Sequence, residues 1–476
     1  MSHRVNFNIF LFVFIYLNDI IIIGDNMIER IFHLKENKTN INTEFIAALT
    51  TFMAMSYIIF VNPSVLSQTG MDYGSVYAAT IITTVLATLI LGLYANVPYA
   101  SSAGIGLGSL FTYTICGSLG YTWQQALAIV FICGIINLII TFTSIRKRII
   151  RSIPTFLQDA ITVGIGLFIT YVGLINAGII EFGASSITNG IANDVVPMVA
   201  NLTKPEVYLS LIGLVFTSIL LVKKVKGAYL KGILFTTVIG IFLGVTKLPD
   251  FSNYTILPSI SPTILKLDFN GLFSATTGAL IVLMTIFTLC ISDLFDTIGI
   301  FIGTGKKAGI FKIDKNGNMP KRLEKAMIAD SCGTVIGSLL GTSNATTYLE
   351  SSAGIEAGGR TGLTSVFVAI LFILSLFLYP IIKVVPMAAV SPILILIGVS
   401  MLENIGSIDW KDLGIAIPAF FVIVMMPLSY SITTGIEFGF IFYSIVSLCN
   451  HKGKEVSPII YIFSVLFIIK YLMMGL

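Results

Sequence analysis

Long apolar stretches recur along the whole chain and restrict it to one class of fold. Two examples are AATIITTVLATLILGLYANV (78–97) and TSVFVAILFILSLFLYPII (364–382), and about 20 apolar residues in a helix cross the hydrocarbon core of a bilayer. Charged residues make up only 11% of the chain and hydrophobic residues 55%, which leaves too little charge to cover a soluble protein of this size. The sequence therefore predicts an all-α polytopic protein that lies in a lipid bilayer.

We predict about fourteen transmembrane spans, arranged as two sets of seven. The first set covers residues 44–67, 76–98, 100–116, 123–143, 154–178, 206–222 and 228–246, and the second covers 272–302, 324–342, 345–359, 362–384, 386–403, 412–430 and 432–448. A further apolar stretch at 457–476 is either one more span or an interfacial helix.

Basic residues separate the predicted loops into two sets. One set contains RKRIIR (146–151), KKVK (223–226), KKAGIFKIDKNGNMPKR (306–322) and HKGKE (451–455), whereas the opposite loops contain only Lys204, Lys247, Lys266 and Lys383. The positive-inside rule places the first set, the N-terminus and the end of the second repeat in the cytoplasm of a cell-membrane protein. Because seven is odd, the second set enters the membrane from the other side, so the halves are inverted repeats.

These spans define the predicted organisation of the chain. It consists of a cytoplasmic segment (1–43), a first repeat (44–246), an extracellular connection (247–271), a second repeat (272–448) and a C-terminal segment (449–476). Residues 1–26 contain an apolar run that is interrupted by Asn18 and Asp19, and Met27 opens a polar segment. We therefore hypothesise that 1–26 is a dispensable extension.

The pentapeptide SSAGI occurs twice, at 101–105 in the third span and at 351–355 in the tenth. Both spans are short and rich in Ser and Gly, so interrupted helices are expected. Broken segments at matching positions of inverted halves indicate a transporter binding site near the bilayer midplane. We expect the two copies to face one another across a substrate site. The alternative is that small residues merely allow helices to pack closely.

Three carboxylates stand out among those inside predicted spans, where ionisable residues are costly and usually functional. Asp293 and Asp296 are three residues apart in the eighth span, which puts them on one helix face, and Glu350 lies in the tenth. None has a basic residue in its own span, so the group suits a cation or a substrate that offers N–H donors. Tyr348 could add an aromatic face or a hydroxyl. The alternative is that one aspartate caps a kink or bonds the backbone of a neighbouring helix.

Other side chains carry weaker signals. Glu437, about a turn inside the fourteenth span, is expected to be interfacial or structural. No histidine lies in a predicted span, and the five cysteines contain no CxxC pair. We therefore expect no metal site, no disulfide framework and no cofactor, and the basic residues of the loops do not point to nucleic acid.

Five longer motifs together resemble the AzgA-like purine permeases, which belong to the nucleobase–cation symporter family with the uracil and xanthine permeases. They are HLKENKTNINTEFIAALTTFMAMSYIIFVNP (33–63), DLFDTIG (293–299), TYLESSAG (347–354), GGRTGLTSV (358–366) and IPAFFVIVMMPLSYSITTGI (417–436). The resemblance runs from about residue 27 to the C-terminus and follows the order and spacing of the family.

The resemblance implies a core domain (spans 1–4 and 8–11), a gate domain (spans 5–7 and 12–14) and short antiparallel strands in spans three and ten. It implies proton-coupled uptake of hypoxanthine, guanine or adenine by elevator-type alternating access, with sodium coupling and a gate-domain homodimer left open. The implied substrate-binding residues are Glu350, Asp296, Tyr348, Ser102, Ser351, Gly104 and Gly108. The implied proton-coupling residues are Asp296, Glu350 and Asp293.

One motif departs from the family. GIGLGS (104–109) stands where AzgA-like members usually show GMGLNA, so Gly108 replaces an Asn and leaves the preferred purine open. The alternatives are a transporter of the same fold for an inorganic anion or for another nucleobase. An intramembrane aspartyl protease is disfavoured because Asp293 and Asp296 share one helix instead of facing each other across a cleft.

Overall fold

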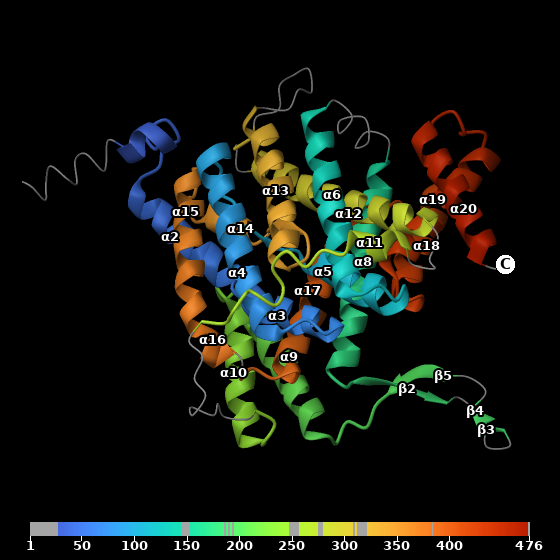
Figure 1. The fold of residues 1–476 in the computed structure, drawn as a ribbon, viewed down its shortest axis with the longest axis horizontal. Coiled ribbons are helices and arrows are strands. Elements are labelled where there is room, and N and C mark those ends of the chain that lie inside the picture. Colours follow the sequence, from blue (N-terminus) through green and yellow to red (C-terminus); the bar gives the residue numbers. More distant parts are fainter. Residues whose placement is uncertain are drawn as a thin grey trace, which may run out of the picture.

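The computed structural model is mostly helical (Figure 1). It describes residues 27–143, 153–184, 187–188, 191–192, 195–246, 257–274, 279–307, 310–311, 321–382 and 384–474. The hypothesised extension at 1–26 and part of the basic loops lie outside these residues. Within them, seven helices are long and apolar enough to cross a membrane, and five shorter apolar helices accompany them.

The elements of the first half of the chain follow the predicted spans in order. Its elements are α2 (Ile41–Met55), α3 (Ile58–Leu66), η1 (Ser67–Thr69), α4 (Tyr73–Ile90), η2 (Leu91–Ala95), β1 (Ser101–Ala103), α5 (Ile105–Ser109), η3 (Leu110–Ser118), α6 (Trp123–Phe142), α8 (Thr155–Asn176), β2 (Ile180–Ala184), β3 (Ile187–Thr188), β4 (Ile191–Ala192), β5 (Val195–Val199), α9 (Pro205–Val222) and α10 (Ala228–Phe242). The third predicted span is the interrupted one, a strand followed by a short helix.

The second half repeats this order. Its elements are α11 (Phe269–Ser274), α12 (Ala279–Lys307), α13 (Lys321–Leu340), β6 (Ala345–Thr347), α14 (Ser351–Glu356), α15 (Gly362–Ser375), η5 (Leu376–Leu378), α16 (Tyr379–Ile382), α17 (Met387–Met401), η6 (Leu402–Ser407), α18 (Leu413–Leu428), α19 (Ile432–Cys449) and α20 (Pro458–Met474). The tenth predicted span is again a strand and a short helix, and the apolar stretch 457–476 contains a full helix.

Local sequence signals place the beginnings of several helices. Asn40 and Asp72 accept backbone N–H bonds at the starts of α2 and α4, and Thr122 and Gln125 form a capping box before α6. Such side chains satisfy donors that the first turn of a helix leaves without a partner. The predicted span boundaries agree with these starts to within a few residues for this reason.

The two interrupted spans are joined by a short antiparallel ladder between β1 and β6. Ser101 pairs with Thr347, Ser102 with Thr346, and Ala103 with Ala345. This confirms the antiparallel strands expected in spans three and ten.

The ladder also corrects our expectation for the SSAGI repeat. The first copy begins with strand β1, but the second lies in helix α14, and the partner strand is the preceding segment 345–347. The copies are therefore not equivalent in structure, and their facing each other across a substrate site stays a prediction. Ala100, just before the first copy, donates its N–H to Ser351 Oγ at 3.1 Å and accepts from Tyr348 N at 2.9 Å.

The helices pack as two groups that match the expected core and gate. Helices α8, α17, α18 and α19 pack closely on one another, with α9 and α10 against α17. The other group comprises α2, α4, α6, α13 and α15, with α12, α14 and the β1–β6 ladder packed among them. The groups meet where α3 contacts α17, α2 contacts α10, and α5 and α12 contact α8.

A feature that the sequence analysis did not predict is a β-hairpin between α8 and α9. Strands β2 and β5 pair antiparallel from Ile180 opposite Val199 to Ala184 opposite Val195, and β3 pairs with β4 beyond them. The hairpin projects away from the helices (Figure 1).

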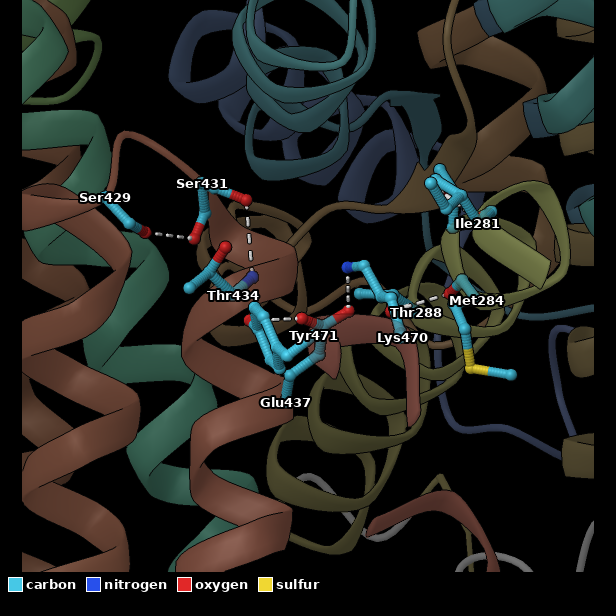
Figure 2. A network of polar contacts seen from close by, with 10 residues as sticks. Ile281, Met284, Thr288, Ser429, Ser431, Thr434, Glu437, Lys470 and Tyr471 are labelled. Atoms are coloured by element: carbon cyan, nitrogen blue, oxygen red, sulfur yellow. Dashed lines mark hydrogen bonds and ion pairs between the residues drawn. The ribbon is translucent and has the colours of Figure 1, made fainter. Parts of the chain in front are cut away.

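Helix α20 is fastened to α19 by a buried ion pair. Glu437 of α19 is 0% exposed, and its Oε1 lies 2.5 Å from Nζ of Lys470. Tyr471 donates its hydroxyl to the other carboxylate oxygen at 2.5 Å (Figure 2). Phe463 of α20 stacks on Phe287 of α12, so α20 contacts both helix groups. Glu437 is therefore structural and not interfacial. The sequence analysis had left both roles open.

Breaking this ion pair from one side is expected to destabilise the protein. Lys470→Met leaves the Glu437 carboxylate buried without its cation, which costs about 3–5 kcal/mol for a typical buried pair. We expect a clear loss of thermal stability in detergent, measured by size-exclusion fluorescence after heating. The exposed Lys452 provides the control Lys452→Met, which should leave the transition unchanged.

The double variant Glu437→Gln/Lys470→Met separates charge from packing. Because it removes both charges, it should recover most of the lost stability. A double variant that is as unstable as Lys470→Met alone would contradict this explanation.

Candidate substrate-binding site

The β1–β6 ladder is held in place by hydroxyl side chains of its two flanking helices. Thr88 of α4 accepts from Ser101 N and donates to Ser101 O, both at 3.1 Å. Thr84 of α4 shares a 2.6 Å hydrogen bond with Ser102, and Thr334 of α13 donates to Ala345 O at 2.9 Å. These bonds satisfy strand backbone and hydroxyl groups away from water, where an unpaired group would be costly. The ladder is therefore a fixed platform.

Glu350 lies at the end of this platform, in the turn between β6 and α14. Its Oε1 accepts a 2.5 Å hydrogen bond from the hydroxyl of Tyr57, which is 1% exposed. Tyr57 lies between α2 and α3 in the first span, so the bond joins the first and tenth spans. The carboxylate is half-buried and its orientation is set by this phenol.

Tyr348 connects the other predicted site residues. Its hydroxyl donates to Ala103 O at 2.5 Å and lies near Ser102. The same phenol interacts electrostatically with both Glu350 and Asp296. Tyr348 therefore lies near three other predicted site residues, Ser102, Glu350 and Asp296.

Asp330 of α13 belongs to this group, and sequence reasoning missed it. Its two carboxylate oxygens accept hydroxyl bonds from Thr347 of β6 at 2.8 Å and from Thr297 of α12 at 2.6 Å. It also interacts electrostatically with Asp296. Asp330 thus ties the helix that carries Asp296 to the strand that precedes Glu350. The signal was available, because Asp330 is an acidic residue inside the predicted ninth span.

Asp293 and Asp296 leave their helix in different directions. Asp293 is buried against α6, where Asn137 donates Nδ2–H to its Oδ2 at 2.7 Å, whereas Asp296 lies near Asp330 and Tyr348. Residues three apart on a helix differ by about 60° in direction, which is enough to separate their surroundings. Asp293 thus bonds a side chain of a neighbouring helix, whereas the structural alternative had named the backbone of such a helix.

The remaining predicted site residues contribute to the backbone arrangement of the broken segments more than to contacts with Glu350. A Cβ on Gly104 would lie 2.7 Å from Thr346 Oγ1, so only glycine allows the two broken segments to approach this closely. A Cβ on Gly108 would face Asn62 Oδ1 and Ser343 Oγ, each at 3.4 Å. Ser351 holds the start of β1 through its bond from Ala100 N.

Tyr229 of α10 reaches Glu350 from the other helix group. Its ring packs edge-on against Tyr57, with centroids 5.2 Å apart, and it interacts electrostatically with Glu350. Tyr229 also lies near Ser400 of α17. Glu350 therefore lies at the junction of the two helix groups, a common position for a small-molecule site.

The chemistry of this group favours N–H donors. Carboxylate and hydroxyl oxygens surround the site, and no Lys, Arg or His is among the contacts described for Glu350. Carboxylates accept parallel bonds from adjacent N–H groups, whereas they repel anions. Among the described residues, no group of three or more His, Cys, Asp or Glu could hold a metal ion.

Comparison with known proteins defines the class. The model of the permease family (xanthine/uracil permeases) matches residues 42–438. The chain belongs to this family, and the resemblance to AzgA-like purine permeases is confirmed. It is a multi-pass membrane transport protein.

Individual relatives are similar over nearly their whole length. A permease of Methanocaldococcus jannaschii is 42% identical over 444 residues, which are 93% of this chain and 98% of that protein. The adenine permease AdeP of Escherichia coli is 37% identical (94% and 96% covered), and the guanine/hypoxanthine permease PbuO of Bacillus subtilis is 37% identical (92% and 99% covered).

Solved structures of low sequence identity share the fold. The transmembrane domain of the cyanobacterial bicarbonate transporter BicA superimposes with a TM-score of 0.57 at 15% identity, over 81% of this chain and 96% of that one. SLC26A9 gives a TM-score of 0.59 at 12% identity, over 86% of this chain and 66% of that one. The transporter fold with two inverted seven-span repeats is thereby confirmed.

Asp330→Asn is expected to loosen the connection between α12 and β6. The amide keeps one acceptor but turns N–H groups toward a hydroxyl that donated to the carboxylate, and a hydrogen bond to a charged group contributes about 1.5–3 kcal/mol. We expect a lower melting temperature and at least about a tenfold loss of transport. Glu356→Gln, at an exposed position of α14, is the control for both measurements. Wild-type transport in Asp330→Asn would remove Asp330 from the site.

Proposed function

We propose that this protein imports purine nucleobases into the cell by proton symport. The observation that carries the proposal is the grouping of Glu350, Tyr348 and Asp296 around two paired broken segments, at the junction of the two helix groups. Relatives named adenine permease and guanine/hypoxanthine permease support the choice of substrate. In this mechanism the protein transports its substrate and catalyses no reaction.

In this proposal Glu350 accepts N–H bonds from one edge of the base. Purine bases carry ring and exocyclic N–H groups that can donate to a carboxylate, and guanine presents two of them side by side, N1–H and the 2-amino group. Tyr348 interacts with Glu350, and Ser102 lies near Tyr348; in this proposal the ring of Tyr348 contacts the face of the base and the Ser102 hydroxyl its far edge. Gly104 and Ser351 hold the backbone around it, and Gly108 acts more indirectly, through Asn62 and Ser343.

We also propose that the core group moves past the gate group as an elevator. The core group would comprise spans 1–4 and 8–11 within repeats 44–246 and 272–448, and it carries the ladder and all the carboxylates of the site. Asp296 would carry the proton, with Glu350 and Asp293 as further candidates, because a neutral carboxyl group crosses a low-dielectric barrier far more readily than a charged one. The N-terminus and the end of the second repeat would face the cytoplasm of a cell-membrane protein.

The direct test is uptake of radiolabelled hypoxanthine, guanine and adenine, each competed by the other bases. Glu350→Gln should reduce uptake to background, because the amide loses the charge and one acceptor site. Glu356→Gln, six residues further along, should transport like the wild type. Normal uptake by Glu350→Gln at equal membrane expression would exclude Glu350 as the base-binding group.

The proton coupling predicts a direction of pH dependence. Uptake should rise as external pH falls from about 8 to about 6, because the proton is then taken up more readily outside than inside. A protonophore should abolish concentrative uptake. Asp296→Asn should lose concentrative uptake while still exchanging labelled for unlabelled base. Uptake that ignores pH and protonophore but requires sodium would contradict the proton mechanism.

A further inference from the structure

Tyr57 donates a hydrogen bond to the Glu350 carboxylate, and the sequence analysis gave it no role although it lies within the motif at 33–63. It lies in the break between α2 and α3, where Phe60 N and Val61 N both donate to its carbonyl oxygen at 3.0 Å. This tight turn fixes the backbone of Tyr57 at the start of α3. The side chain therefore has a firm base from which to reach the tenth span.

The surroundings of Tyr57 leave it little freedom. The side chain is 1% exposed, its ring lies edge-on to Tyr229 at 5.2 Å, and its centroid is 6.5 Å from that of Tyr348. Buried edge-to-face pairs of this kind contribute beyond simple area burial. Tyr229 belongs to α10 of the gate group, so both helix groups together hold the phenol against Glu350.

The hydrogen bond has a consequence for how Glu350 can bind a ligand. A carboxylate offers two oxygens, and the Tyr57 hydroxyl occupies one position on Oε1. This bond restricts the orientation of the carboxylate, and the positions on Oε1 and Oε2 that Tyr57 does not occupy can accept N–H bonds. Holding a ligand group in its binding orientation beforehand raises affinity, because less freedom is lost on binding.

We propose that Tyr57 is a positioning residue that orients Glu350 for a nucleobase, and that the contact with Tyr229 makes this orientation depend on the approach of the gate group. The inference rests on the proposed function. It adds a determinant of affinity that acts through Glu350 and does not itself contact the base.

The test is equilibrium binding of radiolabelled hypoxanthine, guanine and adenine to the purified full-length protein in detergent. Tyr57→Phe keeps the ring and removes the hydroxyl, and we expect the Kd of the base that binds best to rise about tenfold, as for a lost hydrogen bond to a charged group. Tyr77 is a buried tyrosine that donates to Ser375 O at 2.5 Å, so Tyr77→Phe is a matched control with unchanged Kd. An unchanged Kd in Tyr57→Phe, or a lower one, would overturn the proposal.

A double-variant cycle distinguishes positioning from direct contact. Glu350→Asp shortens the side chain and withdraws the carboxylate from Tyr57, so adding Tyr57→Phe should raise the Kd by less than about twofold more. A full further tenfold increase would show that Tyr57 acts independently of Glu350 and overturn the inference.

Two further measurements guard against misleading outcomes. Tyr57→His restores a ring N–H donor and should recover part of the affinity. A His variant that binds no more tightly than Tyr57→Phe would overturn the proposal. If Tyr57→Phe does not fold, a His variant with a Kd more than tenfold above that of the wild type would overturn it instead. If the wild-type protein binds none of the three bases, the proposed function itself fails. If the wild type binds and Tyr57→Phe binds equally well, only the inference about Tyr57 fails.

Discussion

The pairing of β1 with β6 is the constraint on which the rest of the structure depends. Two spans give up their helical hydrogen bonds inside the membrane, where every backbone N–H and C=O needs a partner from the protein. The strands supply these partners to each other, and threonines of α4 and α13 supply the remainder. Because the ladder joins the two halves of the chain, it also fixes their relative position at the level of Glu350.

The buried carboxylates are organised around this ladder through hydroxyl groups. Asp330 accepts from Thr347 on the strand and from Thr297 on α12, while Tyr348 reaches from β6 back to the carbonyl of Ala103. Hydroxyls donate to carboxylates without cancelling their charge. The site therefore keeps a negative character while its geometry is fixed, which suits a ligand that brings N–H groups or a proton.

Much of this arrangement follows from the sequence, but its register does not. Apolar run lengths and basic loops predicted the spans, and the small polar stretches predicted where two of them break. The SSAGI repeat led to a wrong prediction, that its two copies have equivalent structures. Small residues fit a strand or a helix turn equally well, so only strand pairing decides which of the two forms. Strand β6 is instead formed by Ala345–Thr347, whose β-branched threonines favour extended backbone.

Other features depended on contacts between distant parts of the chain. Tyr57 and Glu350 are 293 residues apart, and an isolated tyrosine in an apolar segment gives no sign of its partner. Asp330 could have been found by applying the rule used for Asp296 to the ninth span. The hairpin at 180–199 lies between two spans. It does not pack a face against the helices, so its sequence carries no periodic apolar pattern that would have predicted it.

Comparison of the buried Glu437 with the half-buried Glu350 shows what separates a structural carboxylate from the one that we propose binds substrate. Glu437 has a cation and a phenol, so both of its oxygens and its charge are compensated inside the protein. Glu350 has a phenol on one oxygen, and no cation is among the contacts described for it. An uncompensated charge at membrane depth is costly, so it is retained where a ligand or a proton completes it. A glutamate thus holds α20 in place at position 437, whereas we propose that the glutamate at position 350 binds a ligand.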